Sequence, residues 1–567
     1  MEQKMEATHI VIGGGSAGCV VAARLSEDPA NQVLLIEAGE DFAEGETPGD
    51  ILDTYAGRAL NNPRYFWPSL QARRGDDPAL SEAARQPMKY EQARVIGGGS
   101  TINGQVALRG LPADFDRWRE LGAVGWDWES VLPFFRRLET DRDFAGGVHG
   151  NDGPIAIRRI AEASWDPFTR AVCGVWAKEG YAWRPDMNGA PGEGYAAIPL
   201  ANNGERRSSV ALEYLTPAVR RRPNFQIRPG TEARRILFDG RNAVGVEVET
   251  GAGRERITGR NVIVSAGALH TPWLLMHSGI GPARHLGECG IDVLVDRAGV
   301  GENLLDHPTI AISSYLPPAV RARPVLRHNY VNLLYSSGAE GCAPLDMVIS
   351  VVCRSAWHAI GERLGTIAAY VGKSYSRGYV RLSRDDPGGR PDVCFNWLDD
   401  ERDAVRLADA FVRLATLYRA GSVPQFAWHP FAASFSDRVR KIGRRTLKNK
   451  ILTESAAFAM DNSAALREYL INNHMSSDED IASIVGDPVR LREHVKRSAS
   501  TLWHPSGTCR MGPVDDPKSV TDARGQVIGT GHLYVADASL MPEIPTHNLN
   551  IPSIMIGERM ADLLKRA

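Results

Sequence analysis

The chain has 567 residues, of which 43% are hydrophobic and 24% are charged, a composition that excludes an intrinsically disordered protein. Its 66 Lys and Arg nearly balance its 68 Asp and Glu, and the formal net charge of −2 gives no global field that would attract nucleic acid or an anionic membrane. The 56 glycines are about a tenth of the chain, above the usual ~7%, and they lack the three-residue period of collagen.

Seven cysteines are scattered along the chain, and no two of them have CxxC spacing. This pattern argues against a disulfide framework and against a zinc site, so we expect no metal. The N-terminal segment passes from charged residues directly into an apolar strand, without the hydrophobic region and cleavage site of a signal peptide. No apolar run approaches the ~20 residues that span a bilayer. We therefore expect a cytoplasmic protein that associates with no membrane.

Residues 8–37 have the pattern of a strand–helix–strand unit. An apolar run at 10–12 leads into GGGSAG, a helical segment follows at 19–25, and a second apolar run covers 33–36. Such a unit is typical of dinucleotide binding and of a Rossmann-like α/β fold.

Three glycines in this unit form the spacing G-x-G-x-x-G. Gly13 permits the tight turn, Gly15 lets the backbone approach a pyrophosphate, and Gly18 lets the helix pack closely on the sheet. Glu37 lies 19 residues beyond Gly18, where an acid can accept a hydrogen bond from a ribose hydroxyl. The motif alone does not separate FAD from NAD.

A second glycine cluster, RVIGGGSTING, occupies residues 94–104. A flavin needs such a second cradle, because its isoalloxazine ring extends well away from the ADP moiety. Two further segments have the same character. Residues 264–281 predict a strand, a glycine turn and a helix, and residues 531–558 predict a strand that ends at Asp537 before a C-terminal helix.

These segments resemble the signatures of the glucose–methanol–choline (GMC) oxidoreductases, which are FAD-dependent enzymes that oxidise alcohols. GGGSAG, RVIGGGSTIN, SAGALHTPWLLMHSGIG, GVGENLLDHP, WHPSGTCRMG and VADASLMPEIPTHNLNIP follow one another in the family's order, from Ile10 to Leu564. Within the family, the segments ILDTYAG, FWPSLQARRG and YEQARVIGGGSTING are most similar to hydroxymethylfurfural oxidases, and pyridoxine oxidases are close neighbours.

The resemblance implies FAD as cofactor and His504 and Asn548 as the catalytic pair. In this hypothesis His504 removes the hydroxyl proton while the α-carbon transfers hydride to flavin N5, and Asn548 donates to the substrate oxygen. The residues that it implies for cofactor binding are Gly13, Gly15, Ser16, Ala17, Gly18, Glu37, Ala38, Arg94, Gly98, Gly99, Ser100, Asn103, Gly104, Ala233, Ala266, Gly267, Trp503, Asp537, Ala538, Asn548 and Asn550.

The expected reaction is oxidation of aryl or furanic primary alcohols to aldehydes, with O2 as acceptor and H2O2 as product. Onward oxidation to the acid and the choice between monomer and homodimer stay open. Three alternatives remain: a dehydrogenase that uses a quinone or another acceptor, a pyridoxine-type oxidase, and a non-redox flavin-containing lyase. Some relatives attach FAD through a histidine in the second cradle. The matching position here is Ile102, so we expect non-covalent FAD.

The cofactor motifs divide the chain into two interleaved domains. We expect the FAD-binding domain at 7–160, 227–307 and 500–567, and the substrate-binding domain, an antiparallel sheet flanked by helices, at 161–226 and 308–499. A Pro/Gly turn predicts a hairpin at 376–400.

Several side chains have two readings from the sequence alone. Tyr370, Trp357 and His358 could reach the pocket, but core packing is favoured for them. His547 could alter the polarity of the pocket, but exposure to solvent is favoured. The segment 436–450 holds seven Lys and Arg. A solvated helix face is favoured there over a docking site, since no large apolar face accompanies the charges.

Overall fold

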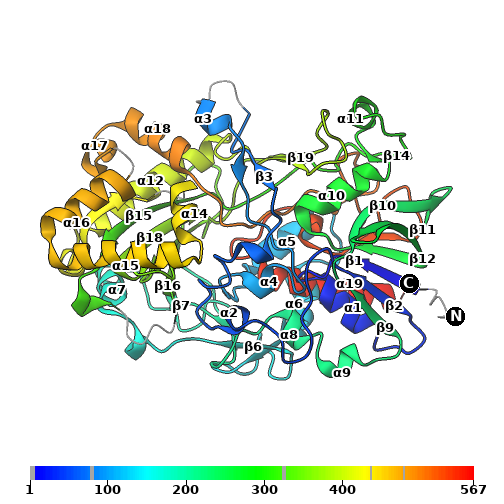
Figure 1. The fold of residues 1–567 in the computed structure, drawn as a ribbon, viewed down its shortest axis with the longest axis horizontal. Coiled ribbons are helices and arrows are strands. Elements are labelled where there is room, and N and C mark those ends of the chain that lie inside the picture. The colour runs from blue at the N-terminus through cyan, green and yellow to red at the C-terminus, as the bar shows by residue number, and fades with distance from the viewer. Residues whose placement is uncertain (1–6, 77–81, 322–326, 434–436, 477–478, 567) are drawn as a thin grey trace.

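The structure of the protein, a computed structural model, describes residues 7–76, 82–321, 327–433, 437–476 and 479–566. Figure 1 shows two sheets, each with its own helices, that lie side by side. Among the described residues, no helix has the length and apolar character that crossing a membrane requires.

The first sheet has seven strands in the order β10-β11-β12-β1-β2-β9, with β22 also paired to β12. Parallel pairing joins β9, β2, β1, the second half of β12, and β22, whereas the first half of β12 pairs antiparallel with β11. The strands are β1 (Ala7–Ile12), β2 (Val33–Ile36), β9 (Phe225–Arg228), β10 (Glu232–Asp239), β11 (Asn242–Thr250), β12 (Gly253–Val264) and β22 (Leu533–Val535).

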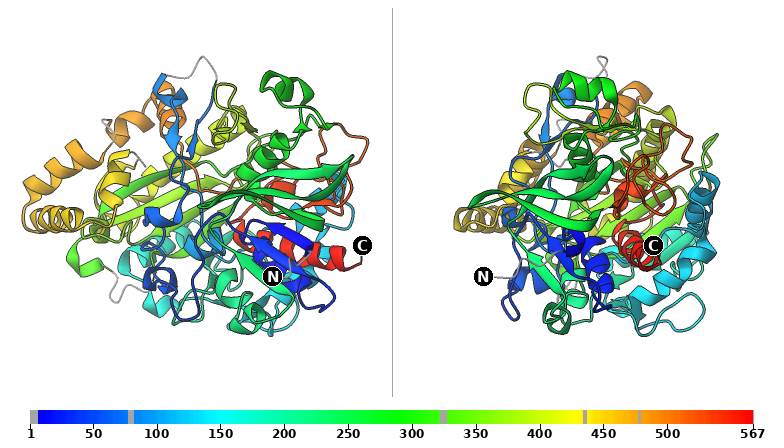
Figure 2. Two further views of the ribbon diagram at one scale, coloured as in Figure 1. Left: turned by 45° about the vertical axis from the view of Figure 1, so that its right-hand side comes forward. Right: turned by 90° about the vertical axis from the view of Figure 1, so that its right-hand side faces the viewer.

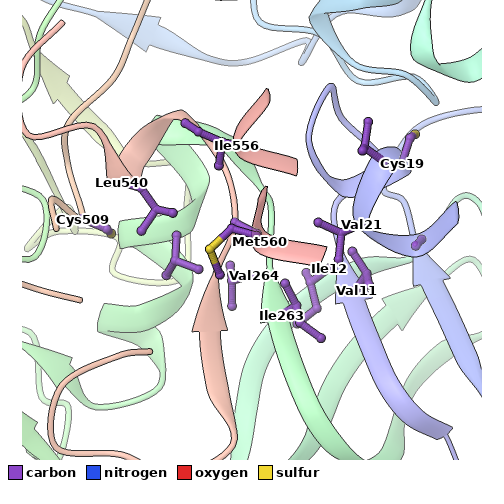
Figure 3. Packing of buried hydrophobic residues seen from close by; sticks show 14 of the residues in the cluster. Val11, Ile12, Cys19, Val21, Ile263, Val264, Cys509, Leu540, Ile556 and Met560 are labelled. Atoms are coloured by element: carbon purple, nitrogen blue, oxygen red, sulfur yellow. The ribbon is translucent and has the colours of Figure 1, made fainter. Parts of the chain in front are cut away.

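Both ends of the chain build the core on this sheet. The helices α1 (Gly18–Leu25) and α19 (Asn550–Lys565) pack against each other beside β1. Figure 3 shows Val11 and Ile263 from neighbouring strands and Met560 from α19 in one apolar cluster. Continuous apolar strands such as β2, with all four residues buried, are typical of a parallel sheet that is covered on both faces.

The elements predicted around the cofactor motifs are confirmed. The run at 10–12 belongs to β1, the helix at 19–25 is α1, and the second run is β2. The predicted turn after residue 264 leads into α10 (Gly267–His277). The predicted C-terminal helix is α19.

The second sheet has six antiparallel strands in the order β21-β15-β18-β17-β16-β7. One face buries Leu333, Ile349 and Ile367 in an apolar cluster that includes Phe411 of α12 (Glu401–Leu417). The strands are β7 (Gly194–Ala197), β15 (Thr309–Tyr315), β16 (Asn329–Tyr335), β17 (Met347–Val352), β18 (Leu364–Val371) and β21 (Trp428–Ala432).

Helices cover the outer side of the second sheet and protrude beyond it, as Figure 2 shows. The longer helices not named above are α5 (Pro112–Glu120), α6 (Trp128–Leu138), α7 (Pro167–Lys178), α14 (Asp437–Gly443), α15 (Leu447–Asn462), α16 (Ala464–Leu470) and α18 (Pro488–Ser498).

The predicted hairpin at 376–400 is confirmed, with β19 (Tyr379–Arg381) antiparallel to β20 (Asp392–Cys394). All strands of the second sheet fall within the segments predicted for the substrate-binding domain. The predicted boundary between 226 and 227, however, cuts through β9, which belongs to the first sheet. The division into two domains stays a prediction.

Candidate active site

A cavity of about 770 Å³ lies where the two sheets meet. Its walls include both glycine loops, the start of α19 and one face of the six-stranded sheet. The predicted residues that line it are Gly13, Gly15, Ser16, Ala17, Glu37, Ala38, Gly98, Gly99, Asn103, Gly104, Ala233, Ala266, Gly267, Trp503, His504, Asp537, Ala538, Asn548 and Asn550.

The two glycine loops fit an extended dinucleotide. A Cβ at Gly98 would lie 2.7 Å from Cα of Gly15, so the loops touch backbone to backbone. A Cβ at Gly15 would meet only the carbonyl oxygen of Ser265, at 3.9 Å, so this position opens into the cavity. Backbone N–H groups that face open space beside a helix N-terminus are suited to bind a pyrophosphate. The residues therefore fit FAD along this wall.

Two buried carboxylates anchor the backbone beside this wall: Glu37 contacts the first glycine loop, and Asp537 contacts the start of α10. Glu37 accepts hydrogen bonds from the backbone N–H groups of Gly14 and Gly39, at 2.8 and 2.7 Å. Asp537 accepts from the backbone N–H of Gly267 at 2.8 Å and from the hydroxyl of Thr271 at 2.6 Å. Burial raises the pKa of both carboxyls, and these donors oppose that shift.

Three predicted cofactor residues do not line the cavity. A Cβ at Gly18 would lie 2.0 Å from the carbonyl oxygen of Gly13, so Gly18 serves the close packing of α1. The guanidinium of Arg94 stacks over the ring of Trp67, with 5.0 Å from Cζ to the ring centroid. The hydroxyl of Ser100 donates to the carbonyl of Gly97 at 2.6 Å and accepts from the N–H of Val210, so it is held within the loop.

The predicted catalytic pair comes together in the cavity wall. Nδ2 of Asn548 lies 3.2 Å from Nε2 of His504, although 44 residues separate them in the chain. An amide nitrogen only donates, so Nε2 of His504 is the acceptor and carries a lone pair. A hydroxyl group in this part of the cavity can therefore meet a proton acceptor and a hydrogen-bond donor together.

A second histidine, His307, fixes the proton on the other side of the His504 ring. Nε2 of His307 lies 3.1 Å from the carbonyl oxygen of Gly372 and 3.0 Å from that of Pro545. Carbonyl oxygens only accept, so Nε2 of His307 carries the hydrogen, and Nδ1 of the neutral ring is an acceptor. The Nδ1 atoms of His307 and His504 are 2.8 Å apart. Nδ1 of His504 must therefore donate, an assignment that rests on the hydrogen-bond network.

Both imidazoles are neutral. Burial lowers the pKa of His504 to about 3 and holds that of His307 well below its usual range. For His504 the cause of the lowered pKa is burial, with no carboxylate against the ring to oppose it. The low pKa therefore keeps Nε2 of His504 unprotonated near neutral pH, where it accepts from Nδ2 of Asn548.

The loop that carries His504 is anchored by Asp306. Its carboxylate accepts from the backbone N–H of His504 at 3.0 Å and from the hydroxyl of Thr501 at 2.5 Å. Between them, Trp503 adopts a φ of 58°, a left-handed conformation that costs on the order of 1–3 kcal/mol for a non-glycine residue. Such strain persists only where the surrounding contacts determine the conformation.

Of the favoured readings of single side chains, that of His547 is wrong and that of Tyr370 is confirmed. Tyr370 packs in a buried apolar cluster, and it also lines the cavity. His547 is 1% exposed, and neither of its ring nitrogens has a hydrogen-bond partner in the described part of the chain. Trp357 and His358 do not line the cavity, and the indole of Trp357 donates to the carbonyl of Gly443 at 2.6 Å.

The basic segment is largely exposed, as the favoured reading of a solvated face expects, and part of it also borders the cavity. Residue 436 lies outside the described residues, and the rest comprises α14, the connection 444–446 and the start of α15. Arg440, Lys441 and Arg444 line the cavity. Glu91 accepts from Nε of Arg440 at 3.0 Å and from the indole of Trp503 at 3.3 Å, which connects α14 to the loop of His504.

Sequence reasoning assigned no role to several residues of this site. His307 and Asp306 lie in GVGENLLDHP, a motif that carried the resemblance, and this was the one available signal for them. Asn329, Asn332 and Ser350 line the cavity from β16 and β17, in a region where no motif marks individual positions.

Comparisons with known proteins agree with this geometry. Two models of the GMC oxidoreductase family match residues 7–309 and 374–557. The chain is 36% identical to a 5-(hydroxymethyl)furfural oxidase of Methylovorus sp. (strain MP688), over 98% of each chain. It is 33% identical to an oxygen-dependent choline dehydrogenase of Sinorhizobium fredii, over 98% of this chain and 95% of the relative. The crystal structure of pyridoxine 4-oxidase from Mesorbium loti superposes with a TM-score of 0.79 at 28% identity, over 99% of this chain and all of the other.

The role of His307 can be tested with two amide substitutions. His307→Asn places an amide oxygen near the position of Nδ1, so an acceptor for His504 is kept. His307→Gln reaches the position of Nε2 and keeps a donor for the two carbonyls, but it offers His504 no acceptor. We expect flavin reduction by an alcohol to fall by about 10²–10⁴-fold in the Gln variant, the size of a lost general base, and by much less in the Asn variant. Equal rates in the two variants, measured by anaerobic stopped-flow absorbance, would contradict the assignment.

Proposed function

The chain belongs to the GMC oxidoreductase family and is an FAD-dependent oxidoreductase that acts on alcohols, and on that premise we propose a specific reaction for it. It oxidises a primary alcohol on a furan or aryl ring to the aldehyde, and O2 is reduced to H2O2. Similarity to the 5-(hydroxymethyl)furfural oxidase over nearly the whole chain supports the substrate class.

One observation carries the proposal: the pairing of His504 and Asn548 in the cavity wall, at 3.2 Å. In the proposed reaction Nε2 of His504 takes the hydroxyl proton, and Nδ2 of Asn548 donates to the same oxygen as negative charge develops on it. When bound, FAD supplies the acceptor for the hydride that leaves the α-carbon. The protein holds the alcohol so that one oxygen faces both side chains, which lowers the entropic cost of reaction.

Removal of the proposed base tests this function. We expect His504→Ala to keep bound FAD and its yellow colour but to lose about 10²–10⁴-fold in the rate of flavin reduction by benzyl alcohol or hydroxymethylfurfural. The control is His532→Ala, because His532 is an exposed histidine outside the cavity. Anaerobic stopped-flow measures the rate, and peroxide formation under air checks the acceptor. Near-native reduction in His504→Ala would overturn the assignment. Dye reduction without oxygen consumption would overturn O2 as acceptor.

We propose further that FAD is held without a covalent bond. The side chain at the position where some relatives attach FAD is Ile102, which lines the cavity and has no nucleophilic atom. Acid precipitation of the holoenzyme should therefore release all of the flavin into the supernatant. Flavin that stays with the precipitated chain, detected by its absorbance after washing, would contradict the proposal.

A further inference from the structure

The outer helices beside the six-stranded sheet expose an unusual number of large hydrophobic side chains. Among the described residues, nine such side chains are at least half exposed, and six of the nine lie on α15 and α16. Single exposed apolar side chains are normal on a protein surface, whereas a concentration of them on two neighbouring helices marks an interaction surface. The six are Leu447, Ile451, Leu452, Phe458, Leu466 and Tyr469.

The spacing on α15 places three of these side chains on the face that points away from the protein. Leu447, Ile451 and Phe458 lie on one face of the helix, because each interval between them is close to a whole number of turns. Ala457 and Met460 are buried on the opposite face. The outer stripe is about 16 Å long at 1.5 Å per residue. Figure 1 shows α15 and α16 at the outer end of the molecule, far from both termini. A helix that is apolar on both faces is typically covered on both, so the outer stripe requires an occupant.

Positive charge accompanies the stripe. Residues 437–450, which lead into α15 and form its first turn, carry seven Lys and Arg against one Asp. Arg440 and Arg445 form ion pairs with acids of the N-terminal segment, at 3.0 Å each. Lys448 and Lys450 are exposed and form no ion pair within the described part of the chain. These two ammonium groups therefore lie beside the apolar stripe and are available to an anionic partner.

The charge determines which occupant fits. A second copy of the chain is disfavoured, because a symmetric interface joins identical patches and brings the same basic side chains face to face. An anionic bilayer attracts each Lys and Arg near its surface, and the boundary below its headgroups accepts Leu, Ile and Phe. Glu454 and Glu468 are exposed on the same helices. Residues 437–470 nevertheless hold eight Lys and Arg against four Asp and Glu, so the surface stays positive.

We propose that α15 and α16, with the basic segment before them, dock the protein on an anionic lipid surface. Leu447, Ile451 and Phe458 enter the boundary between headgroups and acyl chains, while Lys448 and Lys450 contact the lipid phosphates. The sequence argued against docking because no apolar face accompanies the charges, and the outer stripe of α15 supplies that face. The net charge of −2 averages over the whole chain and does not describe this surface. The proposal does not depend on which alcohol the protein oxidises.

Flotation of the holoenzyme with lipid vesicles of two compositions tests the docking. One set of vesicles is phosphatidylcholine, and the other is an equal mixture of phosphatidylcholine and phosphatidylglycerol. We expect the protein to float with the anionic vesicles at low ionic strength and to bind phosphatidylcholine at least tenfold more weakly, on the order of one to two lysine contacts. Binding should weaken strongly at about 1 M salt, where the Debye length is only about 3 Å.

Two double variants assign the binding to this surface. Leu447→Ser with Phe458→Ser should lower the apparent affinity for anionic vesicles about tenfold or more, because two apolar side chains no longer leave water. Lys448→Gln with Lys450→Gln should lower it about fivefold for each lysine. None of the four residues lines the cavity, so both variants should retain FAD and the thermal transition of the wild type.

Matched controls make the same changes at exposed positions elsewhere in the chain. Val124→Ser with Val514→Ser removes two apolar side chains that are 71% and 61% exposed. Lys178→Gln with Lys518→Gln removes two exposed lysines. Both controls should bind anionic vesicles as the wild type does.

Each outcome decides for or against the docking surface. Absence of flotation with anionic vesicles at low ionic strength would overturn the proposal, and so would equal affinity for the two vesicle compositions. Unchanged binding in both double variants of α15 would show that the lipid contacts another surface. A dimer in analytical ultracentrifugation that Leu447→Ser with Phe458→Ser separates into monomers would assign the surface to a second copy and contradict the proposal.

Discussion

The hydrogen bond between the two imidazoles of His307 and His504 is the interaction on which the site depends. The carbonyl groups of Gly372 and Pro545 determine which imidazole donates, because they require the hydrogen on Nε2 of His307 and so leave its Nδ1 as an acceptor. Because Nδ1 of His307 then accepts, Nδ1 of His504 must donate across the 2.8 Å contact. The lone pair of His504 is therefore on Nε2, which faces Asn548 and the cavity. A base with the opposite tautomer would present a hydrogen to the substrate and could accept no proton.

The groups that orient His307 come from two distant segments of the chain. Gly372 directly follows β18 of the six-stranded sheet, and Pro545 lies in the loop before α19. The two carbonyls that orient His307 therefore come from segments that are distant in the chain and adjacent in space. Figure 1 shows the same principle on a larger scale, with α1 and α19 from the two ends of the chain beside the same strands. Cofactor cradle and proton acceptor are positioned by one set of contacts.

The sequence was sufficient for local features and for motifs with fixed spacing. The strand–helix–strand unit and the two glycine loops follow from patterns of a few residues, whereas the pair of His504 and Asn548 was implied by the family resemblance. The structure brings them to one cavity. The place of the Ser100 hydroxyl could not be predicted, because a hydroxyl in a glycine loop can face a ligand or bond within its own loop. Its contact with the N–H of Val210 depends on the completed fold.

The remaining features depend on contacts between distant segments. His307 and His504 are 197 residues apart, and the orientation of their rings depends on carbonyls from two other segments. Tyr370 faces the cavity because of strand register, which single-residue properties do not encode. The low pKa of His504 follows from burial in the completed fold, which the local sequence around a histidine does not reveal.

The central claim is the position of one hydrogen, and neutron diffraction from a deuterium-exchanged crystal of the oxidised protein measures it directly. The account predicts deuterium on Nε2 of His307 and on Nδ1 of His504, and none on Nε2 of His504. Deuterium on Nε2 of His504, or on Nδ1 of His307, would contradict it.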